Sequence, residues 1–503
     1  MGRNVSIILP NGGIVTLRAV LVSVTGVKLV GGIDSSTQST KVLLVRADDG
    51  VVVGEASAPH PEGTECDPDR WWEALSAAGR GLLERADAVG VAAQQHGMVT
   101  LDSDGVAVRA AMLWNDVKSA PQARELVNEL GAERWAARTG SVPTMSFTVT
   151  KLRWLAEREP EHAARVSRVL LPHDWLTWRL MGGGARGAGG LVEPVTDRGD
   201  ASGTGYYSPT EDAWLPDFAE RALGHSVTLP RVAGPGEAVG RTAWGAVISA
   251  GTGDNMGAAL GMGLADGDVA VSVGTSGTAY AVTAAMSADP SGLVCGFADA
   301  TGRFLPLACT LNAARVLDVT ARLLGVGPAG LSDLALKAPA GADGLVLLPY
   351  LDGERTPNRP AANGVLRGLT TSNATPENLA RAAVEAVICS LADAIDFLRP
   401  CGINPGRIVL TGGAARSEAV RAIAAGVFGL PVVVPAAAEY VALGAARQAA
   451  WALAGSDSPP SWPARPSVTY EASATPEVRE QYGRLRDDAA AWQVTGLAGR
   501  LLG

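Results

Sequence analysis

The sequence is poor in cysteine and in positive charge. Its five cysteines are scattered over 503 residues without a CxxC pair, which disfavours a disulfide framework or a zinc site and predicts free thiols in a reducing cytoplasm. The formal net charge of −9 provides no basic face for a nucleic acid. No apolar run reaches the roughly 18 to 20 uninterrupted residues that cross a bilayer. We therefore expect neither a nucleic-acid partner nor a membrane.

Two further absences narrow the class of protein. No GxGxxG follows an early strand, which disfavours a dinucleotide-binding oxidoreductase. The first 28 residues are apolar only in patches and make a poor signal peptide. We interpret them either as a partly disordered N-terminal extension or as the product of a start codon placed too early. The remaining length suggests two or three domains.

The stretch that is most informative about function runs from residue 246 to 282, AVISAGTGDNMGAALGMGLADGDVAVSVGTSGTAYAV. Asp254 stands in a glycine turn with no His or Cys beside it, so it can act as a lone base or charge. The alternative is an Asx-turn acid that braces a loop. Further on, an apolar run breaks at GTSGT, residues 274–278, and resumes. A turn of small residues between two strands leaves backbone N–H groups free for phosphate oxygens. The stretch predicts a phosphate tail held against a proton acceptor.

A similar hydroxyl-rich turn lies near the start of the chain. Residues 27–45, VKLVGGIDSSTQSTKVLLV, are typical of a strand, a turn and a second strand. At one constant offset, Asp34, Ser36, Thr37, Ser39 and Thr40 align with Ser272, Gly274, Thr275, Gly277 and Thr278. The alignment indicates two related halves, each opening on a hairpin with a phosphate turn; chance similarity of two such hairpins is the alternative. Only the first copy has an acid, Asp34; the aligned residue of the second copy is Ser272. One carboxylate is enough for a Mg²⁺ that keeps most of its water ligands.

Two polar pairs lie where a substrate would bind. The apolar strand expected at 88–93 ends in Gln95 and His96, and ligand sites favour strand ends. A lone histidine is as often a structural hydrogen-bonding group. Asn115 and Asp116 precede a helix expected from about residue 119, so Asp116 either faces a substrate or caps that helix.

A double glycine follows the short strand expected at 407–409. Gly412 and Gly413 then lead into a helix. A strand, glycines and a helix N-terminus together suit part of a nucleotide lying on the backbone, although many strand-to-helix turns look alike.

These pieces carry a family resemblance. In order along the chain stand GIDSSTQSTK, QQHGM, WND, TDRGDASGTG, GTGDN, SVGTSGT, GERTPNRP and LTGGAARS. With this set the chain resembles the FGGY family of carbohydrate kinases, and within it most closely the xylulokinases, from about residue 27 to 454. The resemblance implies an α/β protein with the duplicated, two-domain actin-like ATPase (ribonuclease H-like) fold and its active site in the interdomain cleft. It also implies a homodimer.

The activity implied is Mg²⁺-assisted transfer of phosphate from ATP to a sugar, most closely D-xylulose to D-xylulose 5-phosphate. Asp254 matches the general base, and Asp34 the acid near the metal. The residues implied at the sugar are Gln95, His96, Asn115, Asp116, Asp254 and Asn255. Those implied at the nucleotide are Ser36, Thr37, Thr40 and Lys41 in the first turn, Gly274 and Thr275 in the second, and Gly412, Gly413, Ala414 and Ser417 at the adenosine.

Three departures from the family pattern leave the exact sugar open. Gln95 stands where xylulokinases often have Met, Lys118 where they usually have Arg, and Ser36 where the phosphate turn usually has Gly. A kinase for another ketose or polyol, such as ribulose, glycerol or an alditol, is the nearest rival. A partner-driven actin-like or chaperone-type ATPase is the more distant one, and it would need neither His96 nor Asp254.

Composition also indicates where the domains begin and end. We expect an extension at 1–28, an N-terminal domain with the sugar site and first phosphate turn at 29–240, and a C-terminal domain with the base, second turn and adenosine site at 241–455. A linker and terminal helix follow at 456–503. The Pro/Gly-rich residues 230–240 mark the main boundary, near the hinge for domain closure.

Overall fold

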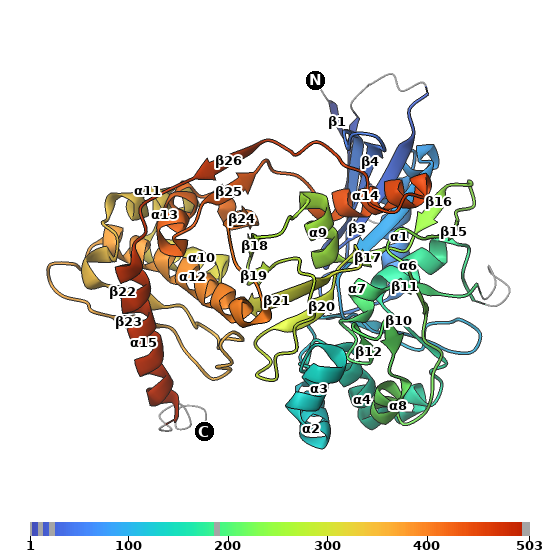
Figure 1. Ribbon diagram of the computed structural model, residues 1–503, viewed down its shortest axis with the longest axis horizontal. Helices are drawn as coiled ribbons and strands as arrows, with labels where there is room; N and C mark the ends of the chain where they lie inside the picture. Colours follow the sequence, from blue (N-terminus) through green and yellow to red (C-terminus); the bar gives the residue numbers. More distant parts are fainter. Residues whose placement is uncertain (1–2, 9–13, 20–25, 186–191, 495–503) are drawn as a thin grey trace.

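Two large β-sheets organise the computed structural model, which describes residues 3–8, 14–19, 26–185 and 192–494 (Figure 1). Within these residues the first sheet has nine strands, in the spatial order β1 (Arg3–Ile8), β2 (Ile14–Ala19), β5 (Val52–Pro59), β4 (Ser39–Arg46), β3 (Leu29–Ser35), β7 (Ala88–Ala93), β16 (Val247–Ser249) and β15 (Ala238–Arg241), with β17 (Thr252–Gly253) paired to β7. The second has seven, in the order β20 (Cys295–Ala298), β21 (Phe304–Thr310), β19 (Gly277–Tyr280), β18 (Asp268–Val273), β24 (Arg407–Thr411), β25 (Val432–Pro435) and β26 (Ser467–Tyr470).

The same strand order recurs at the centre of both sheets. In the first, β5, β4 and β3 are antiparallel and β7 runs parallel to β3; in the second, β21, β19 and β18 are antiparallel and β24 runs parallel to β18. Strands β3 and β7 are buried along their whole length, as the apolar runs LVGGI and AVGVAA require of central strands covered on both faces. This repeat is the duplicated α/β arrangement that the sequence predicted.

The two predicted hairpins differ in register at their turns. In the first, Ser35 pairs with Thr40; in the second, Val273 pairs with Gly277. Residues 36–39 therefore lie between the last paired positions of the first hairpin, and only 274–276 between those of the second, although the two sequences align at a constant offset. No backbone hydrogen bond of the described chain engages the N–H groups of residues 36–38 or 274–276. Both turns keep the free donors that a phosphate requires.

Helices cover each sheet (Figure 1). Against the first pack α1 (Pro68–Gly79), α6 (Pro172–Leu180) and α14 (Tyr440–Ala454). The second half contains α10 (Ala314–Leu324), α11 (Pro328–Lys337), the long α12 (Pro376–Leu398), α13 (Glu418–Phe428) and α15 (Pro476–Val494). Between β9 (Ala111–Met112) and β15, the chain adds α2 (Ala120–Leu130), α3 (Ala132–Thr139), α4 (Thr148–Arg158), α7 (Arg198–Ala201) and α8 (Pro216–Leu223). Helix α9 (Asp254–Met262) follows β17. None of the described helices is long and apolar enough to cross a membrane.

The N-terminal residues and the predicted boundary differ from expectation. Residues 3–8 and 14–19, expected in a partly disordered extension, form β1 and β2; β1 pairs with β2, and β2 pairs with β5. The division predicted at residue 240 does not coincide with the division between the sheets, because β16 and β17 pair with β7 of the first sheet. Helix α14, predicted in the C-terminal domain, also packs on the first sheet. Composition alone does not show that later segments of the chain pack back onto the first sheet. The predicted C-terminal helix is α15, and residues 495–503 lie outside the described residues.

Helix α14 approaches its neighbours at a distance that only glycine permits. A Cβ on Gly32 of β3 would stand 1.9 Å from the carbonyl oxygen of Ala442. On the opposite side of α14, a Cβ on Gly444 would stand 1.8 Å from the carbonyl oxygen of Gly257 in α9. Both obstacles are backbone atoms, which cannot rotate away. The contacts therefore fix α9, and Asp254 as its first residue, against the first sheet.

We predict that Gly444→Ala destabilises the protein by about 1 to 3 kcal/mol or more, because the new methyl group overpacks a backbone contact. The thermal unfolding midpoint should fall by several degrees. Gly327→Ala is the matched control, since a Cβ at Gly327 meets no atom within 4 Å. Equal midpoints for the two variants would contradict the close contact between α9 and α14.

Candidate active site

A cavity of about 290 Å³ lies between the two halves of the chain. The half built on the first sheet contributes Thr37, Gln95, His96, Trp114, Ser146, Asp254 and Asn255 to its lining. The half built on the second sheet contributes Ser272, Gly274, Ser276, Thr278, Cys295, Phe297, Leu307, Cys309 and Arg355. The cavity thus brings together both predicted phosphate turns, the predicted base and the predicted sugar-binding pair.

Asp254 is the first residue of α9, directly after the two-residue strand β17. Its Oδ1 accepts hydrogen bonds from the backbone N of Asn255 at 2.8 Å and from Asn255 Nδ2 at 2.9 Å. No other side chain of the described residues donates to this carboxylate. Burial, followed by the charges of Asp34 and Asp200, raises its pKa to about 7. Asp254 is therefore held by one oxygen and has the proton affinity of a base that works near neutral pH.

Gln95 and Asn255 follow the neighbouring parallel strands β7 and β17 of the first sheet. The Nδ2 of Asn255 donates to Gln95 Oε1 at 2.9 Å. Gln95 is buried, and its Nε2 has no partner in the described structure. An unpaired buried amide is costly, so this donor is suited to a ligand oxygen.

The His96 ring is held in one tautomer. Its Nδ1 lies 2.7 Å from the carbonyl oxygen of Gly203, and because a carbonyl can only accept, Nδ1 carries the hydrogen. Burial lowers the pKa of His96 to about 3, so the ring is neutral and Nε2 is an acceptor. The rings of Phe147 and Phe297, with centroids 4.8 and 5.7 Å away, enclose it. His96 thus presents an oriented acceptor to a hydroxyl group.

Asp34 provides the second buried carboxylate near the cavity. It is 3% exposed at the end of β3, and it accepts a hydrogen bond from Ser36. Burial raises its pKa to about 6. The nearest predicted cation, Lys41, is paired with Glu439 at 2.6 Å, so it does not neutralise the pair Asp34 and Asp254. Two buried carboxylates that lack a committed counter-charge fit a divalent cation such as Mg²⁺.

Two residues predicted at the sugar, Asn115 and Asp116, lie outside the lining of the cavity. Asp116 is 1% exposed and accepts from Thr64 Oγ1 at 3.0 Å and from the backbone N of Lys118 at 2.9 Å. It does not cap α2, whose N-cap Ser119 makes no side-chain capping bond. Neither Asp116 nor Asn115 lines the cavity. The WND segment instead presents Trp114, whose Nε1 donates to Thr37 Oγ1 at 2.8 Å.

Two residues predicted at the nucleotide are also engaged within the protein. Thr40 is fully buried, and its hydroxyl lies 2.8 Å from His60 Nε2. Lys41 makes the ion pair with Glu439 at the N-cap of α14. Successive side chains of a strand point to opposite faces. The hydroxyl residues predicted to form one phosphate turn are therefore divided: Thr37 lines the cavity, whereas Thr40 is buried in the interior.

The predicted adenosine turn lies beside the second phosphate turn. Strand β24 pairs in parallel with β18, and a Cβ on Gly412 would stand 2.6 Å from the backbone N of Val273. Gly413 and Ala414 begin a single 3₁₀ turn, and Ser417 caps α13 by accepting from the N of Val420 at 3.5 Å. A Cβ at Gly413 meets no atom within 4 Å, so the turn is open. These residues border the phosphate turn without lining the cavity.

Several lining residues were not predicted. Arg355 belongs to the GERTPNRP motif, which was a usable signal. Phe297 and the thiols of Cys295 and Cys309 come from β20 and β21, where nothing in the local pattern distinguishes them from core residues.

A buried ionic cluster supports the site from behind. His173 Nδ1 lies 2.7 Å from Asp200 Oδ2, and its Nε2 lies 3.3 Å from Asp174 Oδ1. Burial alone would lower the pKa of His173, but these carboxylates raise it to about 9. Asp197 in the same cluster accepts from Thr252 Oγ1 at 2.9 Å, directly ahead of Asp254. The TDRGDASGTG segment therefore helps to position the strand that carries the base.

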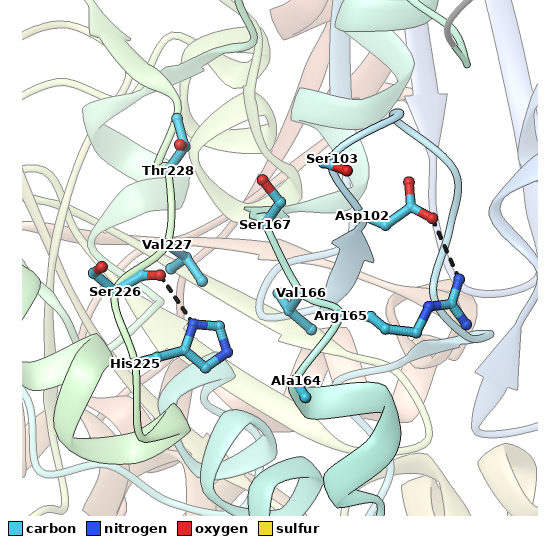
Figure 2. Close-up of a pocket in the computed structure, with 10 residues that line it drawn as sticks. All are labelled: Asp102, Ser103, Ala164, Arg165, Val166, Ser167, His225, Ser226, Val227 and Thr228. Carbon is cyan, nitrogen blue, oxygen red and sulfur yellow. Dashed lines mark hydrogen bonds and ion pairs between the residues drawn. The ribbon is translucent and has the colours of Figure 1, made fainter.

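A larger surface hollow, of about 660 Å³, lies elsewhere on the molecule (Figure 2). Arg165 pairs there with Asp102, and His225 contacts the carbonyl of Ser226. It contains none of the predicted site residues, so the chemistry is assigned to the smaller cavity between the two halves.

Comparison with known proteins agrees with this geometry. A family model described as "FGGY family of carbohydrate kinases, N-terminal domain" matches residues 29–270, and the corresponding C-terminal-domain model matches residues 269–453. The chain is 48% identical to a xylulose kinase from Streptomyces coelicolor, covering 86% of this chain and 89% of that protein. It is 46% identical to one from Streptomyces rubiginosus, over 89% and 92% of the two chains.

Solved structures share the fold. The xylulose kinase of Bifidobacterium adolescentis superposes with a TM-score of 0.85 at 42% identity, covering 92% of this chain and 99% of that one. The glycerol kinase of Plasmodium falciparum with ADP reaches 0.81 at 17% identity, over 93% and 98% of the two chains, which reflects the fold alone. The two repeated sheets are thus those of the two-domain actin-like ATPase fold, and the chain belongs to the FGGY family of carbohydrate kinases.

Proposed function

We propose that this chain is a xylulose kinase, which transfers the γ-phosphoryl group of ATP to the terminal hydroxyl of D-xylulose. The observation that carries the proposal is that one cavity is lined by Asp254, by His96 and by residues of both predicted phosphate turns. The similarity to proteins described as xylulose kinases supports this choice of sugar. A partner-driven ATPase would have no need of this polar pocket.

Proton transfer is assigned to Asp254. The sugar hydroxyl oxygen forms a bond to the γ-phosphorus, the bond from that phosphorus to the β,γ-bridging oxygen breaks, and the hydroxyl proton passes to the carboxylate. Asn255 restrains one carboxylate oxygen and so orients the other. Gln95 Nε2 would donate to a sugar oxygen, and His96 Nε2 would accept from a hydroxyl. A pocket built to pair hydroxyls rejects analogues that lack them.

The phosphate chain of ATP would rest on the free N–H groups of turns 36–38 and 274–276. Phosphoryl transfer depends mainly on such positioning and on charge stabilisation. Mg²⁺, held near Asp34 largely through water, would neutralise the phosphate oxygens. The turn at Gly412 and Gly413 would receive the adenosine.

Compartment and assembly are further parts of the proposal. All five cysteines are free, which supports a reducing cytoplasm. We propose the homodimer that the family resemblance implies, and light scattering of the purified protein tests it.

A sugar panel tests the proposed substrate. With ATP and Mg²⁺ in a coupled ADP-release assay, D-xylulose should give the highest kcat/KM among D-xylulose, ribulose, glycerol and an alditol, because the pocket pairs its hydroxyls. A higher value for another member would identify a different substrate. ADP release that is independent of any sugar would reject a sugar kinase.

Asp254→Asn should lower kcat by about 10² to 10⁴, which is the usual contribution of a general base. The amide preserves shape but cannot take the proton, so the dissociation constant of ATP should change less than about threefold. Asp266→Asn is the control, since the side chain of Asp266 is 81% exposed and lies outside the cavity. Near-normal turnover by Asp254→Asn would refute this role.

The acidic side of the pH profile should follow Asp254. Its pKa of about 7 means that the carboxyl gains a proton as the pH falls through neutrality, and a protonated acid cannot serve as the base. Hence kcat/KM for xylulose should fall about tenfold per pH unit below this value. In Asp34→Asn the midpoint should move to lower pH, because one neighbouring negative charge is gone. Comparing the two proteins cancels the titration of ATP itself; an unmoved midpoint would contradict the coupling.

A further inference from the structure

Arg355 carries a charge that the described protein does not balance. Its guanidinium lines the active-site cavity. The polar contacts of that group within the described structure are with two thiols: Nη2 lies 3.9 Å from Cys295 Sγ, and Cys309 is the second partner. No described carboxylate forms an ion pair with it. A thiol is a weak, neutral acceptor. Burial raises the pKa of both thiols above the usual value, so neither sulfur supplies a negative charge.

The preceding residue explains why Arg355 is held in the cavity. Glu354 is 1% exposed, and its carboxylate accepts from the backbone N of Leu311 at 2.6 Å and from Asn312 Nδ2 at 3.0 Å. It also accepts from the backbone N of Arg355 at 2.7 Å. With Glu354 fixed to the interior, the next side chain along the chain is left at the cavity wall.

This anchor is continuous with the second phosphate turn. The segment that Glu354 binds leads into α10, where the N of Ala314 donates to the carbonyl of Gly274 at 2.8 Å and the N of Ala313 to that of Thr275 at 3.2 Å. Arg355 and the phosphate turn are therefore tied to one short piece of backbone. Their relative position is set by hydrogen bonds rather than by a flexible loop.

The cavity is lined by one positively charged side chain, Arg355, and no role has yet been assigned to it. Among the residues that line the cavity, Asp254 and Arg355 alone carry a formal charge, because His96 is neutral. Lys41 is committed to Glu439. A partly buried cation without a counter-charge is costly unless a ligand supplies one. The anion that enters a kinase cleft is a phosphate, and the planar guanidinium matches phosphate oxygens in a bidentate manner.

We propose that Arg355 is a further catalytic residue, which binds the phosphoryl group as it moves to the acceptor and retains it on the sugar phosphate. The proposal rests on the proposed kinase function. It distinguishes Arg355 from a residue that recognises sugar hydroxyls, since its interaction requires the phosphate. Charge-stabilising groups aimed at a transferring group typically contribute about 10² to 10³ in rate.

The test compares Arg355→Gln and Arg355→Lys with the unsubstituted chain. We measure kcat, the binding of D-xylulose without ATP, and the product-inhibition constant of D-xylulose 5-phosphate. Arg355→Gln should lower kcat about 100-fold or more and weaken inhibition by the sugar phosphate at least about 30-fold, while xylulose binding changes less than about threefold. Arg355→Lys should recover part of both losses, because it restores the charge without the fork.

Arg359→Gln is the matched control, since Arg359 lies in the same segment but does not line the cavity; it should retain all three values. Retained xylulose binding also shows that a variant is folded. Equal weakening of xylulose and xylulose 5-phosphate would overturn the proposal in favour of sugar recognition, and so would unchanged kcat and inhibition. If the unsubstituted chain does not phosphorylate xylulose, the proposed function itself fails and this proposal with it; an active chain with an unaffected Arg355→Gln fails this proposal alone.

Discussion

The contact of backbone against backbone around α14 is the constraint on which the active site depends. Helix α14 comes late in the chain yet rests on β3 through Gly32, and its other side meets α9 at Gly444 and Gly257. Because α9 begins at Asp254, the packing of α14 between β3 and α9 sets the distance from Asp254 to the sheet that carries Asp34. Any side chain larger than hydrogen in these contacts would move the base away from the first phosphate turn. The position of Asp254 thus depends on the packing of small residues that do not themselves line the cavity.

The same close packing creates an unusual distribution of charge. Asp34 and Asp254 are buried near one another, and each has a raised pKa. Lys41 is close to Asp34, but its ion pair goes to Glu439 at the start of α14. The protein alone therefore leaves negative charge on one side of the cleft and the guanidinium of Arg355 on the other. In the proposed function, ATP with its Mg²⁺ would complement both sides at once, with the metal near the carboxylates and the phosphates near the guanidinium.

The sequence predicted those features that are encoded locally. The apolar strand at 88–93 and the two hairpins are present as expected, because period and turn chemistry determine them. Gln95, His96 and Asp254 meet in one cavity, because β7 and β17 are parallel neighbours whose ends lie at the same edge of the first sheet. Gly274 follows β18 of the second sheet, so its approach depends on how the two sheets are placed. The side chains of Thr40 and Asp116 do not line the cavity. Their directions depend on alternation along β4 and on a hydrogen bond from Thr64, a distant residue, and neither can be read from the local sequence. The pairing of β16 and β17 with the first sheet is likewise a long-range contact that no local pattern records.

The duplicated hairpins show how one motif acquires two functions. In the second turn, the carbonyls of Gly274 and Thr275 accept from the first residues of α10, so the N–H groups are left for phosphate and the turn carries no charge. In the first turn, Ser36 donates to Asp34, and an acid stands where the second copy has Ser272. In the proposed function, the neutral turn would receive the phosphates of ATP and the acidic turn would lie near the bound Mg²⁺. The asymmetry of the repeat would then match the asymmetry of the ligand.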